Sequence, residues 1–224
     1  MEKLAAMGRL VAGLSHEVRG PLGTILGSTQ SLQRNPALPA AAKESLARIE
    51  EAGKRIKSLV ENLLGFSRVS LTTIVRVDLC SLVESALELT DFETRSRGIE
   101  IVKSLDRKAP MLNGNFNTLK QVFINLIGNA VQAMEGQGGG TIKLSVSPSP
   151  DGFGAVAEVA DTGPGMPREI SDKIFEPFFT TKGKKGTGLG LWVVSRIVSA
   201  HKGRITVESA PGRGTTFRIS LPAA

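Results

Sequence analysis

A single histidine, His16, stands in the middle of a segment with a coiled-coil pattern. Apolar residues recur there in alternating steps of three and four, at Leu4, Met7, Val11, Leu14, Val18, Ile25 and Leu32. Counted from this seam, His16 lies on the opposite face of the predicted helix. Glu17 follows it, and a carboxylate bonded to one imidazole nitrogen leaves the other nitrogen free as a nucleophile. A lone helical histidine is more often an inert or core residue, but this pair suggests an imidazole presented to a partner.

Two asparagines lie four residues apart in an otherwise apolar helical segment, so Asn125 and Asn129 share one face. Burying an amide without a hydrogen bond costs roughly 1–3 kcal/mol, so both side chains need partners. Hydrogen bonds from the helix to a neighbouring loop would satisfy them. The alternative is a hard cation such as Mg²⁺, which takes oxygen ligands and shares them with phosphates and water.

Glycine-rich segments follow at three places in the chain. Asp161-Thr-Gly163-Pro-Gly165 comes after a predicted strand, where the carboxylate can accept a hydrogen bond from an exocyclic amine and the glycines let a ligand approach. Lys182-Gly-Lys-Lys-Gly186-Thr-Gly188-Leu-Gly190-Leu191 opens into a helix, whose first backbone N–H groups can bind an anion. Gly212-Arg-Gly214-Thr215 leads into the last predicted strand. The middle segment matches neither a Walker P-loop nor a Rossmann fingerprint.

The N-terminal part, residues 1–70, has a helical period throughout. A second seam runs over Ala42, Leu46, Ile49, Gly53, Ile56, Val60 and Leu63. Asn35-Pro-Ala-Leu-Pro39 between the two seams predicts a turn, and Pro21 is expected to kink the first helix. The two helices therefore form an antiparallel hairpin. Because a hairpin covers only one face of each helix, we expect it to pair with a second copy as a dimeric four-helix bundle.

The C-terminal part, residues 71–224, mixes strand and helix patterns. Apolar residues alternate near Ile99, Ile142, Ala155, Ile205 and Phe217, which predicts strands there, and a short strand is expected between Val69 and Asp78. Helices are predicted over residues 79–97, 117–134, 170–175 and 189–200. This pattern indicates an α+β domain with its helices on one face of the sheet.

Composition narrows the class of protein. The 28 Lys and Arg residues exceed the 21 Asp and Glu residues by seven, and hydrophobic residues make up 41% of the chain, a balance typical of a globular protein. One cysteine excludes a disulfide framework and, with two histidines, a Cys/His zinc site, so Cys80 is expected to be a small buried hydrophobe.

The same composition bears on partners and location. Aromatic residues are only 4% and tyrosine is absent, which disfavours nucleic acid as a partner. The sequence has no run of 18 uncharged apolar residues and its first residues lack a signal-peptide core. We therefore expect a cytoplasmic protein without direct membrane contact.

The order of these segments resembles the catalytic core of a two-component sensor histidine kinase, nearest to the nitrogen-regulation type. Residues 15–22, with Ser15-His16-Glu17 and Pro21, resemble the family's H box, residues 125–130 its N box and residues 161–165 its G1 box. Phe175-Glu-Pro-Phe-Phe-Thr-Thr181-Lys182 is similar to the F box, residues 186–191 to the G2 box and residues 212–215 to the last nucleotide box. Six boxes in family order span nearly the whole chain.

The resemblance implies a dimerisation and histidine phosphotransfer hairpin over residues 1–70 and a Bergerat-type α/β sandwich that binds ATP over residues 71–224. His16 would attack the γ-phosphate, with Glu17 as base or tautomer-fixing group. The phosphoryl group would then pass to an aspartate on a response-regulator receiver domain.

The resemblance also implies a set of cofactor-binding residues for ATP and Mg²⁺. Asn129 would hold Mg²⁺ with Asn125 nearby on the phosphates, and Asp161 would bond the adenine amine. The other implied nucleotide contacts are Gly163, Gly165, Thr181, Lys182, Gly186, Gly188, Gly190, Leu191 and Thr215.

Three positions depart from the family pattern. Gly20 stands where relatives usually carry Thr or Asn to orient a water for dephosphorylation, so we expect weak phosphatase activity. His201 is followed by Lys202 in place of a more usual glycine, and its expected role is structural. Asn115 replaces an Asp at the start of the N-box helix and is expected to cap it about as well.

Three alternative functions are compatible with this nucleotide fold: an ATP-hydrolysing clamp, a protein serine kinase and a non-enzymatic dimeric scaffold. An ATP-hydrolysing conformational clamp, as in gyrase, would carry a Glu at position 125 to activate water, and Asn125 cannot act as that base. A protein serine kinase would leave His16 and the paired hairpin unexplained. A dimeric scaffold with a vestigial site is disfavoured because every expected site residue is present.

Overall fold

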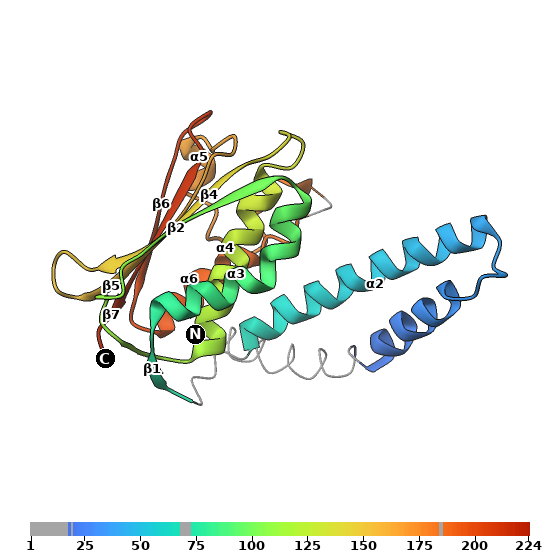
Figure 1. Cartoon of the computed structure of the whole chain (residues 1–224), viewed down its shortest axis with the longest axis horizontal. Coiled ribbons are helices and arrows are strands. Elements are labelled where there is room, and N and C mark those ends of the chain that lie inside the picture. The colour runs from blue at the N-terminus through green and yellow to red at the C-terminus, as the bar shows by residue number, and fades with distance from the viewer. Residues whose placement is uncertain (1–17, 19, 68–72, 184–185) are drawn as a thin grey trace. The chain divides into compact units, whose positions relative to one another are not determined.

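The chain folds into two compact units, Met1–Ser70 and Leu71–Ala224 (Figure 1). The structure, a computed structural model, describes residues 18, 20–67, 73–183 and 186–224, and for residues 54, 55 and 57–67 it describes the backbone only. Within these ranges, no helix combines the length and the hydropathy needed to cross a bilayer.

The first unit contains the predicted helical hairpin. Its first helix includes residues 20–33 and its second, α2, runs over Ala40–Ser67. Asn35 closes the turn, since its backbone N–H donates to Leu32 C=O at 3.0 Å and its Oδ1 accepts from the Ala37 N–H at 3.0 Å. Pro21 lies among the helical residues, so the backbone does not unwind at this position.

The two helices of the hairpin approach closely at a glycine. Leu22 is buried, and a Cβ on Gly53 would lie only 2.7 Å from Leu26 Cδ2. Four seam residues nevertheless remain between 45% and 50% exposed: Ile25, Leu32, Ile49 and Ile56. The hairpin alone therefore leaves part of its apolar seam uncovered.

The second unit is built on a five-stranded sheet in the order β2-β4-β5-β7-β6. Its strands are β2 Ile99–Leu105, β4 Gly140–Pro148, β5 Gly154–Asp161, β6 Arg204–Ser209 and β7 Thr215–Pro222. The β2–β4 pair is parallel and the other pairs are antiparallel. A separate antiparallel pair joins β1 Val75–Val77 to β3 Leu112–Gly114, and β3 is a strand that the sequence pattern did not predict.

One face of this sheet carries the helices, as predicted (Figure 1). These are α3 Leu79–Ser96, α4 Phe116–Ala133 and α6 Gly190–Ala200. Alternate strand residues point into the core and are buried: Ile142, Leu144, Val146, Ala157, Val159, Phe217, Ile219 and Leu221. Their neighbours on the opposite face are polar, with Arg218 and Glu158 paired at 2.7 Å across adjacent strands.

The helix predicted over residues 170–175 is wrong. The structure has a single helical turn, α5 Arg168–Ser171, which ends before Asp172. The chain then turns so that Ile174 is buried and the Phe175 ring meets the Phe217 ring edge-on at 6.4 Å. The burial of Ile174 and the ring contact of Phe175 therefore accompany a turn in place of the predicted helix.

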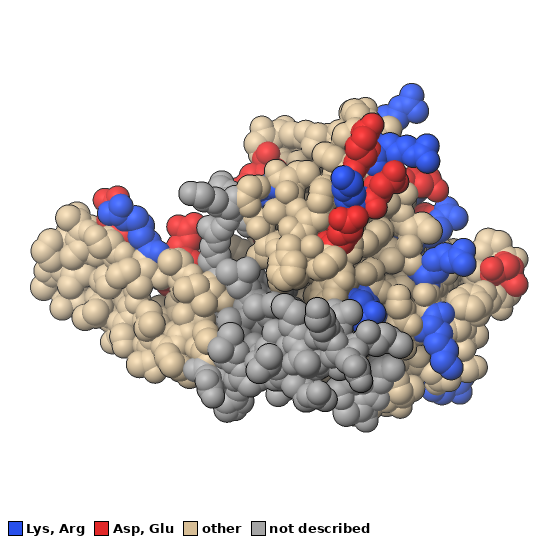
Figure 2. Space-filling view, turned by 180° about the vertical axis from the view of Figure 1, so that it is seen from behind, with Lys and Arg blue, Asp and Glu red and all other residues tan. Residues whose placement is uncertain are grey.

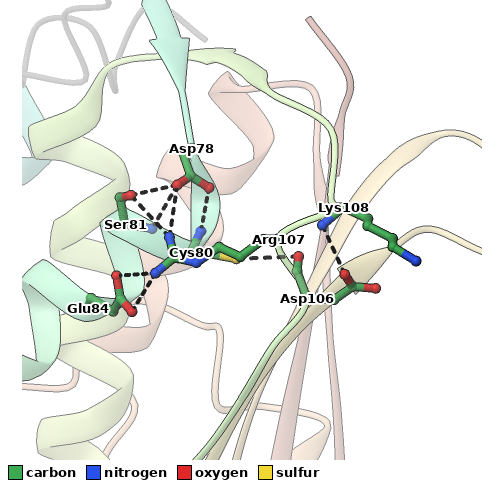
Figure 3. A network of polar contacts seen from close by, with 7 residues as sticks. All are labelled: Asp78, Cys80, Ser81, Glu84, Asp106, Arg107 and Lys108. Atoms are coloured by element: carbon green, nitrogen blue, oxygen red, sulfur yellow. Dashed lines mark hydrogen bonds and ion pairs between the residues drawn. The ribbon is translucent and has the colours of Figure 1, made fainter.

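A polar network fixes the start of α3 (Figure 3). Asp78 caps the helix by accepting from the backbone N–H groups of Cys80 and Ser81. Arg107 reaches the same carboxylate at 3.2 Å and holds Glu84 through two hydrogen bonds of 2.7 and 2.8 Å. Burial by itself would raise the pKa of Asp78, but the hydrogen bonds from Ser81 and Cys80 and the Arg107 charge lower it overall.

The same region ties α3 to the end of β2 through Cys80. Its thiol donates weakly to the Asp106 carbonyl at 3.5 Å, and Asp106 Oδ1 accepts from the Lys108 N–H at 2.9 Å (Figure 3). Cys80 is fully buried, and burial raises the pKa of its thiol. The expectation that Cys80 is an inert buried residue is therefore confirmed.

Acidic and basic side chains lie close to one another on the surface of the second unit (Figure 2). On α3, Arg95 pairs with Asp91 at 2.7 Å, and Arg97 pairs with Glu135 at 3.0 Å. These exposed pairs contribute about 0–1 kcal/mol each, so the buried apolar face of the sheet accounts for most of the stability.

His201 joins the end of α6 to the start of α4. It is 4% exposed, its Nδ1 donates to Ile197 C=O at 2.8 Å and its Nε2 accepts from the Asn115 N–H at 3.0 Å. Asn115 in turn caps α4 by accepting from the Thr118 N–H at 3.0 Å. The structural role expected of His201 and the capping role expected of Asn115 are both confirmed.

Replacing His201 by Phe should destabilise the chain by about 1–3 kcal/mol, because the buried Asn115 N–H loses its acceptor. Urea unfolding followed by Trp192 fluorescence measures this, since Trp192 lies on the same helix. Lys202→Ala, at the exposed next residue, is the control and should change the free energy of unfolding by less than about 0.5 kcal/mol. A fully stable His201→Phe variant would contradict the assigned hydrogen bond.

Candidate functional site

Asp161 is the last residue of β5, a central strand of the sheet, where it pairs with Ile142 on one side and Thr215 on the other. Its Oδ1 accepts from the Gly163 N–H at 2.9 Å. Burial raises the pKa of the carboxyl above 3.8, and backbone N–H groups of Gly163 and Thr215 act in the opposite direction without cancelling the rise. No described cation offsets this burial, so a ligand that donates a hydrogen bond to this carboxylate would stabilise its charged form.

Glycines let three backbone segments meet around Asp161. A Cβ on Gly163 would lie 2.8 Å from Asp161 Oδ1, and one on Gly214 would collide with the Asp161 carbonyl. Gly165 has φ +67°, and a Cβ there would collide with the Ala210 carbonyl. Any side chain at these positions would displace the aspartate or the loop around it.

Asn125 on α4 has a polar atom without a partner. Gln121 Nε2 donates to Asn125 Oδ1 at 3.3 Å, whereas Asn125 Nδ2 is buried and has no hydrogen-bond partner among the described residues. Asn129 lies one turn further along the same face. The simple expectation that a loop satisfies the asparagines does not hold for Asn125, and an unpaired buried amide commonly marks a ligand position.

The asparagine helix and the aspartate loop are neighbours. A Cβ on Gly163 would touch Ala133 Cβ and Met134 Cγ, both at 3.4 Å, at the C-terminal end of α4. Thr162 stands between them, accepting from the Thr141 N–H at 3.0 Å and donating to Met134 Sδ at 3.6 Å. Asp161 and the amides of α4 therefore border the same region of the unit.

Residues 175–183 and 186–191, here called the lid segment, contain local backbone strain. Phe178 is a non-glycine residue at φ +66°, and its side chain is 63% exposed. Its N–H donates to Gly188 C=O at 2.9 Å, and a Cβ on Gly188 would collide with the Phe178 backbone. A left-handed conformation costs a non-glycine residue about 1–2 kcal/mol, so this contact holds Phe178 in an unfavoured state.

Lys182 connects the lid segment to α4. Its ammonium donates to Gln132 Oε1 at 2.7 Å, close to the last turn of α4. Neighbouring protein atoms partly desolvate the ammonium and lower the pKa of Lys182, and the Glu135 charge opposes this effect. Thr181 beside it is exposed, and Gly186 allows the chain to pass against Thr180.

The lid segment ends at the first turn of α6. Leu189 occupies the N-cap position without a side-chain cap, and Gly190 and Leu191 begin the helix. A Cβ on Gly190 would meet nothing within 4 Å, so there is room beside the first residue of the helix. Uncapped N–H groups at a helix start favour an anion.

Thr215 closes the site from β7. It is 7% exposed, and its Oγ1 lies 3.1 Å from Ser209 Oγ, which accepts from the Met166 N–H at 2.8 Å. These contacts hold the loop after Asp161 against the sheet, so Thr215 supports the aspartate in addition to lying beside it.

Most residues predicted for the site lie in two connected groups. The first surrounds Asp161 and contains Gly163, Gly165 and Thr215. The second is the lid segment, with Thr181, Lys182, Gly186, Gly188, Gly190 and Leu191, and Lys182 ties it to the helix that carries Asn125 and Asn129. His16 and Glu17 lie outside the described residues.

The sequence patterns did not single out two polar residues of α4, Gln121 and Gln132. Gln121 stands four residues before Asn125 and Gln132 three residues after Asn129, so both belong to the same helical face. Extending the stripe in both directions would have found them.

The donor set fits a nucleotide with a hard cation. Among the described residues, no three His, Cys, Asp or Glu side chains come together as a metal site. Amide oxygens, a lysine and the uncapped N-terminus of α6 suit a nucleotide that binds as its Mg²⁺ complex, because Mg²⁺ takes few ligands from protein in such sites. The half-used Asn125 amide is the observation that favours this fit.

Two family models match the chain. The model for histidine kinase-, DNA gyrase B- and HSP90-like ATPases covers residues 114–224, and that for the His Kinase A phospho-acceptor domain covers residues 6–71. Signal transduction histidine-protein kinase AtoS of Escherichia coli is 38% identical over 99% of this chain and 36% of its own length. Sensory histidine kinase/phosphatase NtrB of Rhodobacter capsulatus is 38% identical over 94% of this chain and 61% of its own. The chain thus spans less than two thirds of either relative.

Solved structures give similar matches. Full-length ShkA in complex with AMPPNP has a TM-score of 0.79 and 32% identity, over 96% of this chain and 47% of its own. Histidine kinase ThkA in complex with the response regulator protein TrrA has a TM-score of 0.67 and 26% identity, over 100% of this chain and 64% of its own.

Removing the charge of Asp161 should stabilise the unliganded protein at neutral pH. The pKa of Asp161 is raised in the folded state, so the wild-type chain loses stability as the pH rises through that pKa. We expect Asp161→Asn to raise the melting temperature at pH 7 by about 2–4 °C, the shift that about 1 kcal/mol produces in a chain of this size. The gain should shrink as the pH falls toward 4.

Thermal unfolding at several pH values tests this, with Glu100→Gln as the charge-matched control at an exposed strand position. A gain that is equal at pH 4 and pH 7, or a loss of stability at pH 7, would contradict the burial argument for Asp161.

Proposed function

We propose that this chain, which belongs to the histidine kinase family, transfers the γ-phosphoryl group of ATP to His16 and then to an aspartate of a response regulator. The resemblance to a histidine kinase catalytic core that the six boxes indicate is confirmed by these matches, and the α+β fold by the structure. The activity, substrates and partners of the whole protein are our proposal.

One observation supports the proposal most strongly: the half-buried Asp161 carboxylate has no described cation partner. A group of this kind at the end of a central strand is suited to accept a hydrogen bond from the adenine amine. Gly163 adds no side chain next to the carboxylate, where a Cβ would lie only 2.8 Å from Oδ1, and this supports close approach of a flat base.

The phosphates would lie between α4 and the lid segment. Lys182 would supply a positive charge there, and the first N–H groups of α6, at Gly190 and Leu191, would donate to the phosphate oxygens. We assign Asn125 to a phosphate and Asn129 to Mg²⁺, whose charge, when bound, offsets that of the phosphates. Thr181, Gly186 and Gly188 would contact the nucleotide as parts of the closing lid, and Thr215 would support the adenine side.

The phosphoryl transfer needs a neutral imidazole. In our proposal one ring nitrogen of His16 attacks the γ-phosphorus, the bond from that phosphorus to the bridging oxygen breaks, and ADP leaves with the electron pair. Glu17 accepts the N–H of the other nitrogen and so holds the tautomer and stabilises the imidazolium that forms. Positioning and charge neutralisation supply most of the rate in phosphoryl transfer.

The proposed partners are a second copy of the chain and a receiver domain. The exposed seam residues Ile25, Leu32, Ile49 and Ile56 support pairing of two hairpins as a four-helix bundle. The ThkA complex with a response regulator supports a receiver domain as phosphoryl acceptor. That this chain binds neither nucleic acid nor membrane directly, and that it is cytoplasmic, stay predictions.

Two remaining expectations concern hydrolysis. An ATP-hydrolysing clamp is not favoured, because Asn125 occupies the position where such enzymes need a general base. Phosphatase activity toward the receiver should be weak, since Gly20 has no side chain to orient a water.

Incubation with γ-labelled ATP and Mg²⁺ tests the proposal. The wild-type chain should become labelled with phosphate that is stable in base and labile in acid, and His16→Gln should abolish the label because no nucleophile remains. His201→Gln, which replaces the other histidine of the chain, is the control. The folded fraction of this variant should become labelled like the wild-type chain. Phosphate on Ser or Thr, or free phosphate without labelled protein, would overturn the proposal.

A further inference from the structure

The side-chain amide of Asn125 is held at one end and left free at the other. Gln121, one turn earlier on α4, donates from Nε2 to Asn125 Oδ1 at 3.3 Å. Asn125 Nδ2 is buried and has no hydrogen-bond partner in the part of the chain that the structure describes. An amide carries an acceptor and a donor at opposite ends, so occupying the acceptor determines which end is left for a ligand.

A free N–H donor suits an anion and not a metal ion. Phosphate oxygens accept hydrogen bonds, whereas Mg²⁺ requires an oxygen ligand and is repelled by an amide N–H. The charge around the helix agrees with this choice, because α4 contains no Asp or Glu over its 18 residues and Lys182 is bonded at its last turn.

We propose that Gln121 is a positioning residue that turns the N–H donor of Asn125 toward a phosphate of ATP, which leaves Asn129 as the protein ligand of Mg²⁺. This inference rests on the proposed function, since it assumes that ATP binds along α4. It adds a residue that none of the sequence boxes contains, and it gives a structural reason for the different roles assigned to the two asparagines above.

The alternative arrangement makes the dependence on Gln121 testable. If both amides were turned over, Asn125 would donate to Gln121 and present its Oδ1 to the ligand. A carboxylate at position 121 can only accept, so Gln121→Glu forces this reversed arrangement with almost no change in size. Gln121→Met removes the hydrogen bond while keeping a side chain of similar length.

The experiment measures the dissociation constants of ATP and adenosine for the full chain by calorimetry, with and without Mg²⁺. Gln121→Met should weaken ATP binding about three- to tenfold, the usual effect of one lost hydrogen bond. Gln121→Glu should weaken it further, because an oxygen then faces the phosphate. Adenosine binding should not change in either variant, which also shows that the adenine side still folds.

Two further variants isolate the route through Asn125. In an Asn125→Ala background, Gln121→Met should have no additional effect on ATP, because its only proposed action is on that amide. Gln137→Glu places the same new charge on an exposed glutamine of the loop after α4 and should leave ATP affinity within about twofold of wild type.

The outcomes separate this inference from the function on which it rests. Loss of ATP affinity in Asn125→Ala, together with a full additional loss from Gln121→Met, would overturn the positioning role alone. Equal weakening of ATP and adenosine by Gln121→Met would also overturn it, as would wild-type ATP affinity in Gln121→Glu. Wild-type affinity in Asn125→Ala would overturn the phosphate contact itself, and the inference with it.

Discussion

The candidate site in the second unit centres on a half-buried carboxylate that has no cationic partner among the described residues. Asp161 ends a central strand, its pKa is raised by burial, and no described cation neutralises it. Such a group costs stability in the unliganded protein, and the cost is recovered only when a ligand supplies a donor. The surrounding glycines are required by close packing, since a Cβ on Gly163 would lie 2.8 Å from Asp161 Oδ1 and one on Gly165 or Gly214 would collide with a backbone carbonyl.

Two further features lie on the elements that carry the predicted phosphate side of the site. Asn125 leaves its Nδ2 without a hydrogen-bond partner among the described residues, and Phe178 is held at a positive φ by its contact with Gly188. Other polar residues use their hydrogen-bonding groups within the protein: His201 uses both ring nitrogens, and Arg107 bridges two carboxylates. Local strain and unmet hydrogen bonds are found at ligand sites more often than elsewhere.

Much of this architecture follows from local patterns in the sequence. Hydrophobic period separates the helical hairpin from the α+β unit, and the turn at Asn35 and the helix start at Asn115 follow from side-chain capping. Long-range packing is not encoded in this way. The helix predicted over residues 170–175 is replaced by a turn in which Ile174 is buried, and β3 forms by pairing with β1 and with Ala223, which are distant in sequence.

The same distinction between local sequence pattern and long-range packing applies to the site residues. Motif spacing singled out Asp161 and the glycines as candidates, because these types are required wherever a backbone must approach a ligand, and their contacts with a nucleotide stay a prediction. The partners of Asn125 and Lys182 depend on side-chain orientations that no spacing specifies, so Gln121 and Gln132 emerged only from the structure. Calorimetric titration of ATP into Asp161→Ala tests whether this carboxylate binds the adenine amine. We expect the affinity for ATP to fall about ten- to hundredfold, the usual effect of losing a hydrogen bond to a charged group. Sedimentation should show the same oligomeric state as for the wild-type chain. Binding as tight as in the wild-type chain would contradict the proposed contact.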